Sequence, residues 1–425
     1  MTYHKLVGAL ACAIVASPLA AQLPLPTTHP KVRAALDIIK SDKAWTLQQQ
    51  IELTQIPSPP FKESARAAEF KKRLEALGLR NVRIDEVGNV IAERPGTGNG
   101  PTVLIEGHLD TVFPEGTNVT VKHKGDTLVA PGIGDDGRGL VTVLSVARAF
   151  EKAGLQTKGT VYFVGNVGEE GPGNLRGTRH LLTKELKGKI DYFITVDGEG
   201  LGIASRAVGS NRYKVTYKGP GGHSYGAFGI PNPIHALGRA IAEISDIQVP
   251  TKPKVTFNVG VISGGTSVNS IPFEGSMQID MRSENVAELA KIDVKVRAAL
   301  KHALDAENAR WTGPRAAKAK LSLVIDTIGI RPTGGQADSA PIVQTAIAAG
   351  KTLGFSVSTG ASSTDANIPI SMGIPGIRIA GGGSGGGAHS LNEWYVDTPN
   401  SYLGPQWAAL LVSSLAGVAP AGVTP

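Results

Sequence analysis

The stretch Val103-Leu-Ile-Glu-Gly-His108-Leu-Asp110-Thr-Val112 decides how the rest of the chain is interpreted. Its first residues are apolar or favour strands, and they run into Gly107. Residues two apart in a strand point to the same side, so the side chains of His108 and Asp110 converge just beyond it. Such a pair is typical of a metal site in which both side chains are ligands. The pair alone also fits a histidine that is simply hydrogen-bonded at a strand end.

The composition is that of a globular protein with more than one domain. The chain has 425 residues, of which 41% are hydrophobic, and its 53 glycines gather in tracts between strand-like runs. We interpret those tracts as turns and site loops. The net charge of +7 is mild, and its densest cluster, Lys71-Lys72-Arg73, lies in a predicted helix. No nucleic-acid partner is therefore expected.

Residues 1–21 have the pattern of a signal peptide. Lys5 precedes an apolar run from Leu6 to Ala16, which is too short to span a bilayer, and small residues follow around Ala20 and Ala21. We expect an exported protein, periplasmic or secreted, whose mature chain is not stably inserted in a membrane. The only cysteine, Cys12, lies in the apolar run, so we expect no disulfides.

The order of predicted elements indicates an α/β protein with an insertion. Continuous apolar strands at 103–106, 160–164 and 192–196 alternate with helices at 63–77 and 138–152, which predicts a doubly wound sheet. From residue 211 to 326 the pattern becomes β-α-β-β-α-β, which is a compact unit in its own right. We therefore predict a catalytic domain made of residues 22–210 and 327–425, interrupted by an inserted domain at 211–326.

Acidic and histidine residues recur at predicted strand ends and in glycine-rich turns. Besides His108 and Asp110, these residues are Asp135, Asp136, Glu169, Glu170, Asp197, Glu199 and His389. Groups at the carboxyl ends of strands in an open α/β sheet gather in one crevice. So many carboxylates would repel one another unless cations lay among them.

Two histidines and several carboxylates suit two zinc ions with one bridging carboxylate, and cobalt or manganese are alternatives. Two such ions can share a water, lower its pKa and polarise a carbonyl group. Adjacent Glu169 and Glu170 cannot easily face the same ion, so one of them can bind while the other acts as general base.

The ordered motifs resemble those of a dizinc peptidase and amidohydrolase family. That family includes glutamate carboxypeptidase, aminoacylase, succinyl-diaminopimelate desuccinylase and aminotripeptidase. The resemblance implies that Asp135 bridges both zinc ions and is joined to Asp136 by a cis peptide. It implies that Glu169 is the general base and that Asp110 orients His108 instead of binding metal. The implied metal ligands are His108, Asp135, Glu170, Asp197 and His389.

The resemblance extends to the inserted domain, which falls where the family has its dimerisation or lid domain. His223 resembles the lid histidine that reaches a neighbouring active site and steadies the tetrahedral oxyanion. Asn269 and Arg282 resemble contacts to a substrate carboxylate, for which a guanidinium is suited. A homodimer is expected because the inserted sheet would otherwise leave an edge unprotected. One departure is Gly137-Arg138, where the family usually has Lys and Gly.

Other interpretations of the glycine-rich motifs fit less well. Residues 132–137 satisfy a dinucleotide-binding G-x-G-x-x-G pattern, but Asp135 and Asp136 would face a pyrophosphate. A serine hydrolase using Ser384 would need a helix after the serine and a different triad order. A non-catalytic binding protein of the same fold would not need a general base, whereas this chain has Glu169 as well as every ligand.

The sequence therefore predicts a metal-dependent exopeptidase or amidohydrolase. Its substrate would be a small peptide or an N-acyl amino acid, cleaved at an amide bond by a water shared between two metal ions. The choice between aminopeptidase, carboxypeptidase and deacylase stays open.

Overall fold

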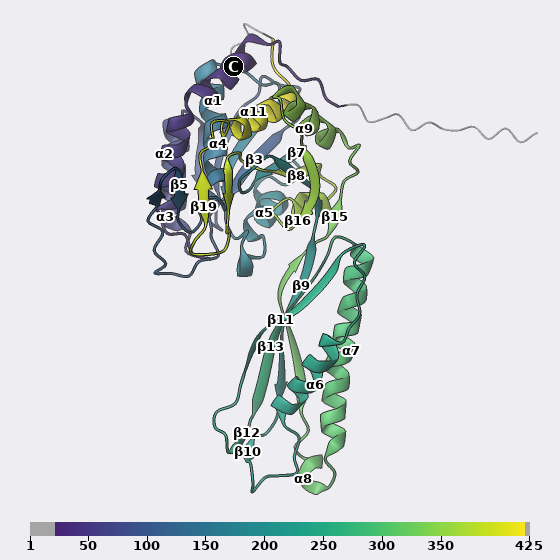
Figure 1. Ribbon diagram of the computed structural model, residues 1–425. Coiled ribbons are helices and arrows are strands. Elements are labelled where there is room, and N and C mark those ends of the chain that lie inside the picture. The colour runs from purple at the N-terminus through teal and green to yellow at the C-terminus, as the bar shows by residue number, and fades with distance from the viewer. Residues whose placement is uncertain (1–21, 421–425) are drawn as a thin grey trace, which may run out of the picture.

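A nine-stranded mixed sheet forms the centre of the first of two lobes in the computed structural model, which describes residues 22–420 (Figure 1). The predicted signal peptide and Cys12 lie outside the described residues. The strand order is β1-β2-β6-β3-β7-β17-β8-β15, and β16 also pairs with β8. The strands are β1 (Arg80–Ile84), β2 (Val90–Arg94), β3 (Val103–His108), β6 (Val161–Asn166), β7 (Tyr192–Val196), β8 (Gly202–Ala207), β15 (Gly334–Gly335), β16 (Ser358–Ser362) and β17 (Gly376–Ile379).

Strand β3 lies between β6 and β7 and is parallel to both, so the three strands end at one edge of the sheet. Every residue of β3 is buried. Val103 and Ile105 belong to the cluster on one face, and Leu104 belongs to the cluster on the other. A strand that buries apolar residues on both faces requires a covering layer on each side of the sheet.

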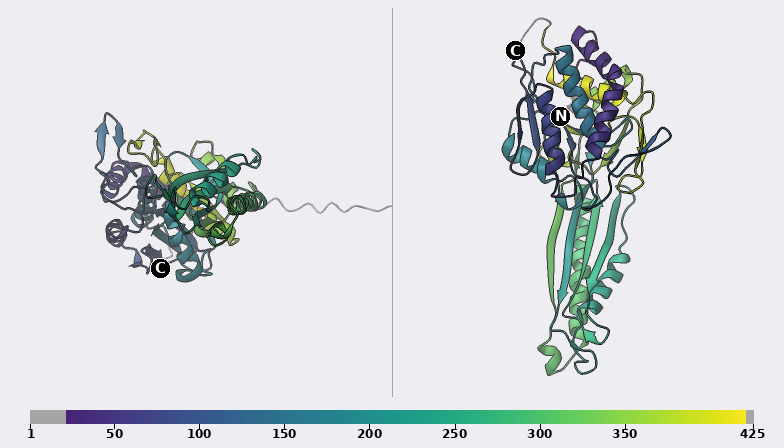
Figure 2. Two further views of the ribbon diagram at one scale, coloured as in Figure 1. Left: turned by 90° about the horizontal axis from the view of Figure 1, so that it is seen from below. Right: turned by 90° about the vertical axis from the view of Figure 1, so that its left-hand side faces the viewer.

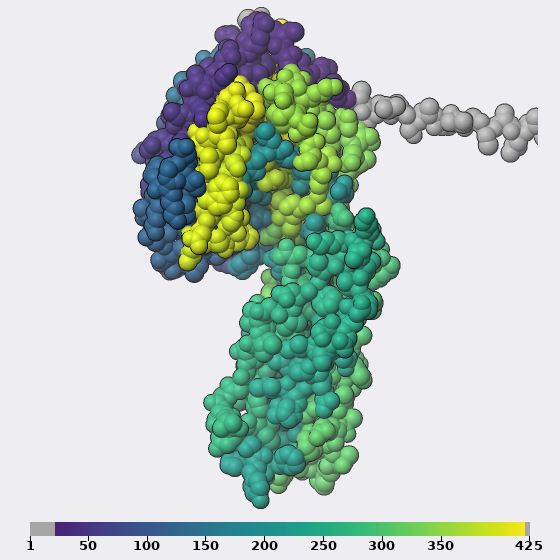
Figure 3. Space-filling view, viewed as in Figure 1, coloured from purple at the N-terminus to yellow at the C-terminus, as the bar shows by residue number. Residues whose placement is uncertain are grey.

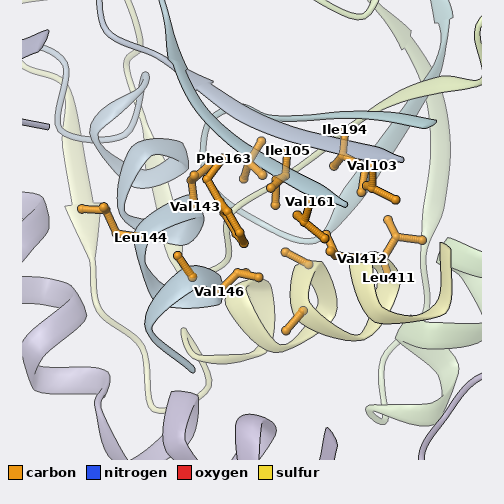
Figure 4. Packing of buried hydrophobic residues seen from close by; sticks show 14 of the residues in the cluster. Val103, Ile105, Val143, Leu144, Val146, Val161, Phe163, Ile194, Leu411 and Val412 are labelled. Atoms are coloured by element: carbon orange, nitrogen blue, oxygen red, sulfur yellow. The ribbon is translucent and has the colours of Figure 1, made fainter. Parts of the chain in front are cut away.

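Figure 4 shows the larger cluster, in which side chains of β3, β6 and β7 pack against α4 (Gly137–Ala153) and α11 (Leu403–Ala416). Phe163 and Val143 are fully buried there, and burying a side chain of this size contributes about 1.5–3 kcal/mol. The same cluster receives side chains from α1 (Pro30–Ser41), α2 (Lys43–Thr54), α3 (Ser64–Ala76) and α9 (Pro341–Thr352).

Shorter helical segments cover the opposite face of the sheet. Leu104 and Phe193 pack there with Leu181 and Ile368. The segments are α5 (Arg176–His180), the π-helical turn at Leu181–Glu185 and α10 (Asn367–Ser371). The predicted doubly wound α/β architecture is thereby confirmed. Within residues 22–420, no helix combines the length and the apolar character needed to cross a bilayer.

The second lobe (residues 209–331) is a four-stranded antiparallel sheet in the order β11-β13-β9-β14, packed against two helices (Figure 1). Asn232 is the N-cap of one of them, and its side chain accepts a hydrogen bond from the Ile234 N–H at 2.9 Å. The elements are β9 (Gly209–Lys218), α6 (Pro233–Ser245), β11 (Val255–Gly264), β13 (Glu274–Ser283), α7 (Val286–Arg310), α8 (Pro314–Ala317) and β14 (Ser322–Arg331).

The second lobe is elongated and runs away from the first (Figure 2). A narrow neck joins the lobes in the space-filling view of Figure 3. The chain enters the second lobe along β9 and returns along β14, and these neighbouring strands pair with each other. At the far end, β10 (Gly222–His223) pairs with β12 (Ser270–Ile271).

A small separate sheet holds two loops of the first lobe together. Its strands, in the order β18-β19-β5-β4, are β18 (Ser384–Gly386), β19 (Trp394–Val396), β5 (Thr127–Val129) and β4 (Lys122–Lys124). Strands β4 and β5 form an antiparallel hairpin. Because β19 pairs with both β5 and β18, the glycine tract before His389 lies beside the chain that leads to Asp135.

Candidate metal centre and active site

The predicted ligands lie where the central strands end. His108 is the last residue of β3, Glu169 and Glu170 follow β6, and Asp197 follows β7. Asp135 is bound to Asp136 by a cis peptide immediately before α4. Because β3, β6 and β7 are parallel neighbours, these loops meet at one edge.

The carboxylate of Asp135 lies between the two histidines. One oxygen, Oδ1, is 2.9 Å from Nε2 of His108, and the other, Oδ2, is 3.2 Å from Nε2 of His389. Nε2 of His389 is also 2.8 Å from Oε1 of Glu170. A carboxylate with one oxygen toward each imidazole is placed to bridge two ions.

Two groups of side chains each bring a ligand atom within 4.8 Å of the others: His108, Asp135 and Glu170, and His108, Asp136 and Asp197. These groups contain four of the five predicted ligands, and His389 joins them through its contacts with Asp135 and Glu170. Imidazole nitrogen and carboxylate oxygen are suitable zinc ligands, so the donor set fits a divalent metal centre.

Within this cluster, the carboxylate of Asp136 binds backbone N–H groups. Its Oδ1 accepts the N–H groups of Gly139 and Gly198, at 2.9 and 3.1 Å, and its Oδ2 accepts the N–H of His108 at 3.0 Å. With its oxygens engaged by the backbone, Asp136 caps α4 and fixes the end of β3. Asp197 is consequently the carboxylate of this group that is left to bind metal.

Burial sets the proton affinities of the cluster. Desolvation raises the pKa values of Glu169, Glu170 and Asp197. Burial also acts to raise the pKa of Asp135, but hydrogen bonds from His108 and His389 outweigh it and lower that pKa. A site that disfavours its own carboxylates in this way is stabilised when cations enter it.

Asp110 holds the segment that carries the two glutamates. Its fully buried carboxylate accepts the N–H groups of Gly168, Glu169 and Glu170 at 2.8, 3.1 and 2.8 Å. Its Oδ1 is 3.8 Å from Nδ1 of His108, whereas its backbone carbonyl is 3.0 Å from that nitrogen. The carbonyl therefore orients the ring, and the carboxylate is committed to the backbone instead of to a metal.

Glu169 is buried next to the ligands and pairs with Arg331, a residue that the sequence did not single out. Nη1 of Arg331 is 2.9 Å from Oε1 of Glu169. Desolvation raises the pKa of Glu169, and the charge of Arg331 opposes that rise. The two residues are far apart in sequence, so no local pattern could have joined them.

Glu393 is a second residue that the sequence did not reveal. Its buried carboxylate accepts the N–H groups of Gly132, Gly134 and Asp135, each at 2.8 Å. Burial raises its pKa to about 7. Since Glu393 follows His389 in the chain, it fixes the loop of Asp135 to the loop of His389, both of which are predicted ligands. Its closeness to His389 was the one signal available.

A cavity of about 440 Å³ opens on the cluster. Its lining combines carboxylates with three arginines. Arg282, the predicted substrate contact, is one of these arginines, and together with Arg212 it flanks Asp280 through Nε contacts of 2.6 and 2.9 Å. The lining includes Asp135, Glu169, Glu170, Asp197, Arg212, Arg282, Arg331, Ser362, Ser363 and His389.

His223 and Asn269 do not line this cavity. They lie together at the far end of the second lobe, where the N–H of Ser224 donates to the Asn269 carbonyl at 2.9 Å (Figure 1). Nδ1 of His223 accepts N–H groups of Tyr225 and Gly226 at 3.3 and 3.2 Å. The proton of a neutral ring is thereby placed on the exposed Nε2.

Ser384 lies in β18, where it pairs with Val396, and no helix follows it. Within the described part of the chain, the ring of His389 contacts the carboxylates of Asp135 and Glu170. The arrangement expected of a serine nucleophile and its histidine is therefore not formed.

A donor set of this chemistry, at the carboxyl edge of an α/β sheet, places the protein among the metal-dependent hydrolases. The chain belongs to peptidase family M20/M25/M40, whose sequence profile matches residues 104–404. The resemblance predicted from the ordered motifs is confirmed, and the chain is a hydrolytic enzyme of that family.

Individual relatives agree with this assignment. The uncharacterized protein YqjE of Bacillus subtilis (strain 168) is 24% identical over 355 residues, 79% of this chain and 90% of that protein. Succinyl-diaminopimelate desuccinylase of Legionella pneumophila (strain Paris) is 28% identical over 207 residues, which is 43% of this chain and about half (53%) of that enzyme. A Staphylococcus aureus tripeptidase shares the fold, with a TM-score of 0.69, 23% identity and coverage of 88% of this chain and 98% of its own.

Proposed function

We propose that the protein hydrolyses an amide bond in a small peptide or an N-acyl amino acid with the help of two divalent metal ions. The observation that carries the proposal is the placement of Asp135 between His108 and His389, with buried Glu169 alongside. The family assignment and the names of the relatives, a desuccinylase and a tripeptidase, support this substrate class.

The ligand set divides around Asp135. His108 and Asp197 would hold one ion, Glu170 and His389 the other, and Asp135 would bridge them. When bound, the ions would lower the pKa of a water and polarise the scissile carbonyl. Zinc suits these nitrogen and oxygen donors, and cobalt or manganese are alternatives.

Glu169 would act as the general base. Its carboxylate lines the cavity but makes its close contact with Arg331 and not with a histidine, which leaves it free of the ligand set. It would take the proton of the attacking water and later pass it to the leaving amine. Arg282 would receive a free carboxylate of the substrate, since it lines the cavity and only its Nε is paired with Asp280.

The substitution Glu169→Ala tests this assignment. We expect both metal ions to remain and turnover to fall by about 10²–10⁴-fold, which is the usual contribution of a positioned base. Glu170→Ala is the matched control, because removing an adjacent ligand carboxylate should lower the metal content. Near-normal turnover in Glu169→Ala would remove the proposed base.

A substrate panel tests the class of reaction. Dipeptides, tripeptides and N-acetyl amino acids are assayed with metal-loaded and chelated protein, together with Ser384→Ala. We expect chelation to abolish hydrolysis and Ser384→Ala to leave it unchanged. Hydrolysis that survives chelation would instead support a serine mechanism.

We also propose that the second lobe forms a homodimer and delivers His223 to the partner's site. Large apolar residues are exposed at the far end of this lobe, among them Tyr225 at 89% and Phe228 at 71%. Such side chains at a lobe tip are typical of an interface. Asn269 lies beside His223 and would contact the substrate in the partner's cavity.

Mixed dimers test this arrangement. Glu169→Ala and His223→Ala subunits, each inactive alone, are mixed after reversible dissociation. A dimer of one of each contains one site with both intact residues, so activity should return to about a quarter of wild type, assuming random pairing and half-active heterodimers. A fully active monomer in light scattering, or no recovery on mixing, would contradict the proposal.

Finally, we propose that the protein is exported, on the basis of the signal-peptide pattern in residues 1–21. Fractionation of cells that express the full chain, followed by N-terminal sequencing, tests this. Intact, unprocessed protein in the cytoplasm would refute it.

A further inference from the structure

The segment that carries the two glutamates is attached to the strands of the neck. The side chain of Asn174 accepts the N–H of Ile330 at 3.0 Å, and Arg179 donates to the carbonyl of Ile330. Nη1 of Arg212, on β9, donates to the carbonyl of Gly171 at 3.0 Å. Both strands that lead to the second lobe therefore contact the chain just after Glu170.

The contact made by Arg331, the last residue of β14, is of a different kind. Its Nη1 is 2.9 Å from the Glu169 side chain, and its Nη2 donates to the Glu169 backbone carbonyl. Nη1 also lies 3.1 Å from the hydroxyl of Ser363. One rigid guanidinium thus holds both the main chain and the carboxylate of the same residue, which a point charge could not do.

Both partners of the contact between Arg331 and Glu169 are buried. Arg331 is 4% exposed and Glu169 is 5% exposed, so bulk solvent screens their interaction only weakly. A charged residue is rarely buried this far unless it is paired. Arg331 is the cation paired with Glu169, whereas Arg212 and Arg282 share Asp280.

We propose that Arg331 is the positioning residue of the general base: it sets the main-chain and side-chain geometry of Glu169 and links both to the last strand of the second lobe. This inference rests on the proposed role of Glu169. A base works only within hydrogen-bond reach of the proton that it takes, so a small displacement is costly. Because Arg331 is the last residue of β14, the position of Glu169 depends on how the second lobe is placed against the first.

The alternative role for Arg331 is a direct contact with the substrate, because it also lines the cavity. The two roles differ in kinetics. Loss of a positioning residue lowers kcat with little change in KM, whereas loss of a uniform substrate contact raises KM.

The test uses Arg331→Ala in the full-length, metal-loaded enzyme, with the best substrate of the panel above. We expect two metal ions per chain, KM within about threefold of wild type and kcat lower by about 10²-fold, as for a displaced base. Guanidinium at a non-denaturing concentration should restore kcat about tenfold in this variant, by refilling the vacated site, and should not rescue Glu169→Ala.

Arg94→Gln is the control for loss of a buried arginine. Arg94 is 5% exposed and pairs with Glu151 at 2.6 Å, away from the cavity. This variant should lose stability and keep its kcat. If Arg331→Ala does not fold, Arg331→Lys replaces it as the test. A lysine keeps the charge but cannot bind the carboxylate and the carbonyl of Glu169 at the same time, so kcat should fall about tenfold.

An Arg331→Ala kcat within about threefold of wild type, or a loss confined to KM, would overturn the inference. An unchanged kcat in Arg331→Lys, when the alanine variant does not fold, would do the same. If Glu169→Ala is inactive while Arg331→Ala is fully active, only this inference fails. If Glu169→Ala is itself active, the proposed function fails first.

Discussion

Removing the metal ions should make the fold less stable as the pH rises. The cause is the set of buried carboxylates around the site. Burial raises the pKa of Asp365 to about 6 and that of Glu393 to about 7, from ordinary values of 3.8 and 4.5. A carboxyl group whose pKa is raised by folding stabilises the fold at low pH, and this contribution is lost between the unfolded and the folded pKa.

The magnitude follows from these shifts. Each is about two units, and one unit corresponds to about 1.4 kcal/mol, so each group loses about 3 kcal/mol over its full window. The window runs from about pH 4 to 6 for Asp365 and from about pH 4.5 to 7 for Glu393. Between pH 5 and 7.5 only part of each window is crossed, and the two groups together should remove at least about 3 kcal/mol.

The assay is urea unfolding of the chelated protein at pH 5 and pH 7.5, followed by tryptophan fluorescence. Trp407, fully buried in α11, reports on the first lobe. The metal-loaded protein should show the opposite trend, since metal binding displaces protons from its ligands. In the chelated Asp365→Asn variant the loss should shrink by about 1 kcal/mol, whereas exposed Asp326→Asn should change nothing. A chelated protein whose stability is flat or increases with pH would refute the electrostatic reasoning.

Three further substitutions test single contacts of the structure. Glu393→Gln removes the charge that holds the N–H groups before Asp135, so metal affinity measured by equilibrium dialysis should fall about 10–100-fold; unchanged affinity would contradict this role. Asp110→Asn places an amide against N–H donors of the Glu169 segment and should lower the free energy of unfolding by about 1–3 kcal/mol, measured with urea. Tyr217→Phe loses the 2.7 Å hydrogen bond to the Leu300 carbonyl in the second lobe; its melting temperature should fall by a few degrees while turnover stays the same.

Much of the fold followed from local patterns in the sequence. The apolar runs that become β3, β6 and β7 are continuous because helices cover both faces of the sheet, and this periodicity is visible without a structure. Helix α6 begins directly after Asn232, a residue type that favours the N-cap position and can be recognised in the sequence. The last helix, α11, was not predicted, because an apolar stretch buried on nearly all sides has no amphipathic period to reveal it.

The ligand positions were also visible, because strand ends and glycine-rich turns are local features. In contrast, Arg331 and Glu393, which hold the site residues in place, could not be identified from the sequence. Arg331 and Glu393 act over distances of 162 and 258 residues in sequence, to Glu169 and to Asp135, and each is a single charged residue in an unremarkable stretch. Whether Asp110 uses its carboxylate or its carbonyl toward His108 depends on a turn geometry that residue spacing does not encode.

The distribution of these contacts between the lobes has a consequence for catalysis. Of the proposed ligands, His108 ends β3, Asp135 and Asp197 lie in loops of the first lobe, and Glu393 and Asp136 hold these segments from within the same lobe. Glu169 is held from both sides: Asp110 binds its N–H, and Arg331 binds its carboxylate from the end of β14. A movement of the second lobe would therefore displace the segment of Glu169 and Glu170, while leaving His108, Asp135 and Asp197 in place. Arg282 lies on β13 of the same lobe, and β13 pairs with β9, which in turn pairs with β14. A substrate whose carboxylate binds Arg282 would therefore influence the position of the second lobe, and with it the position of Arg331. On the proposed roles of Arg282 and Glu169, substrate capture and placement of the base would both depend on this one sheet.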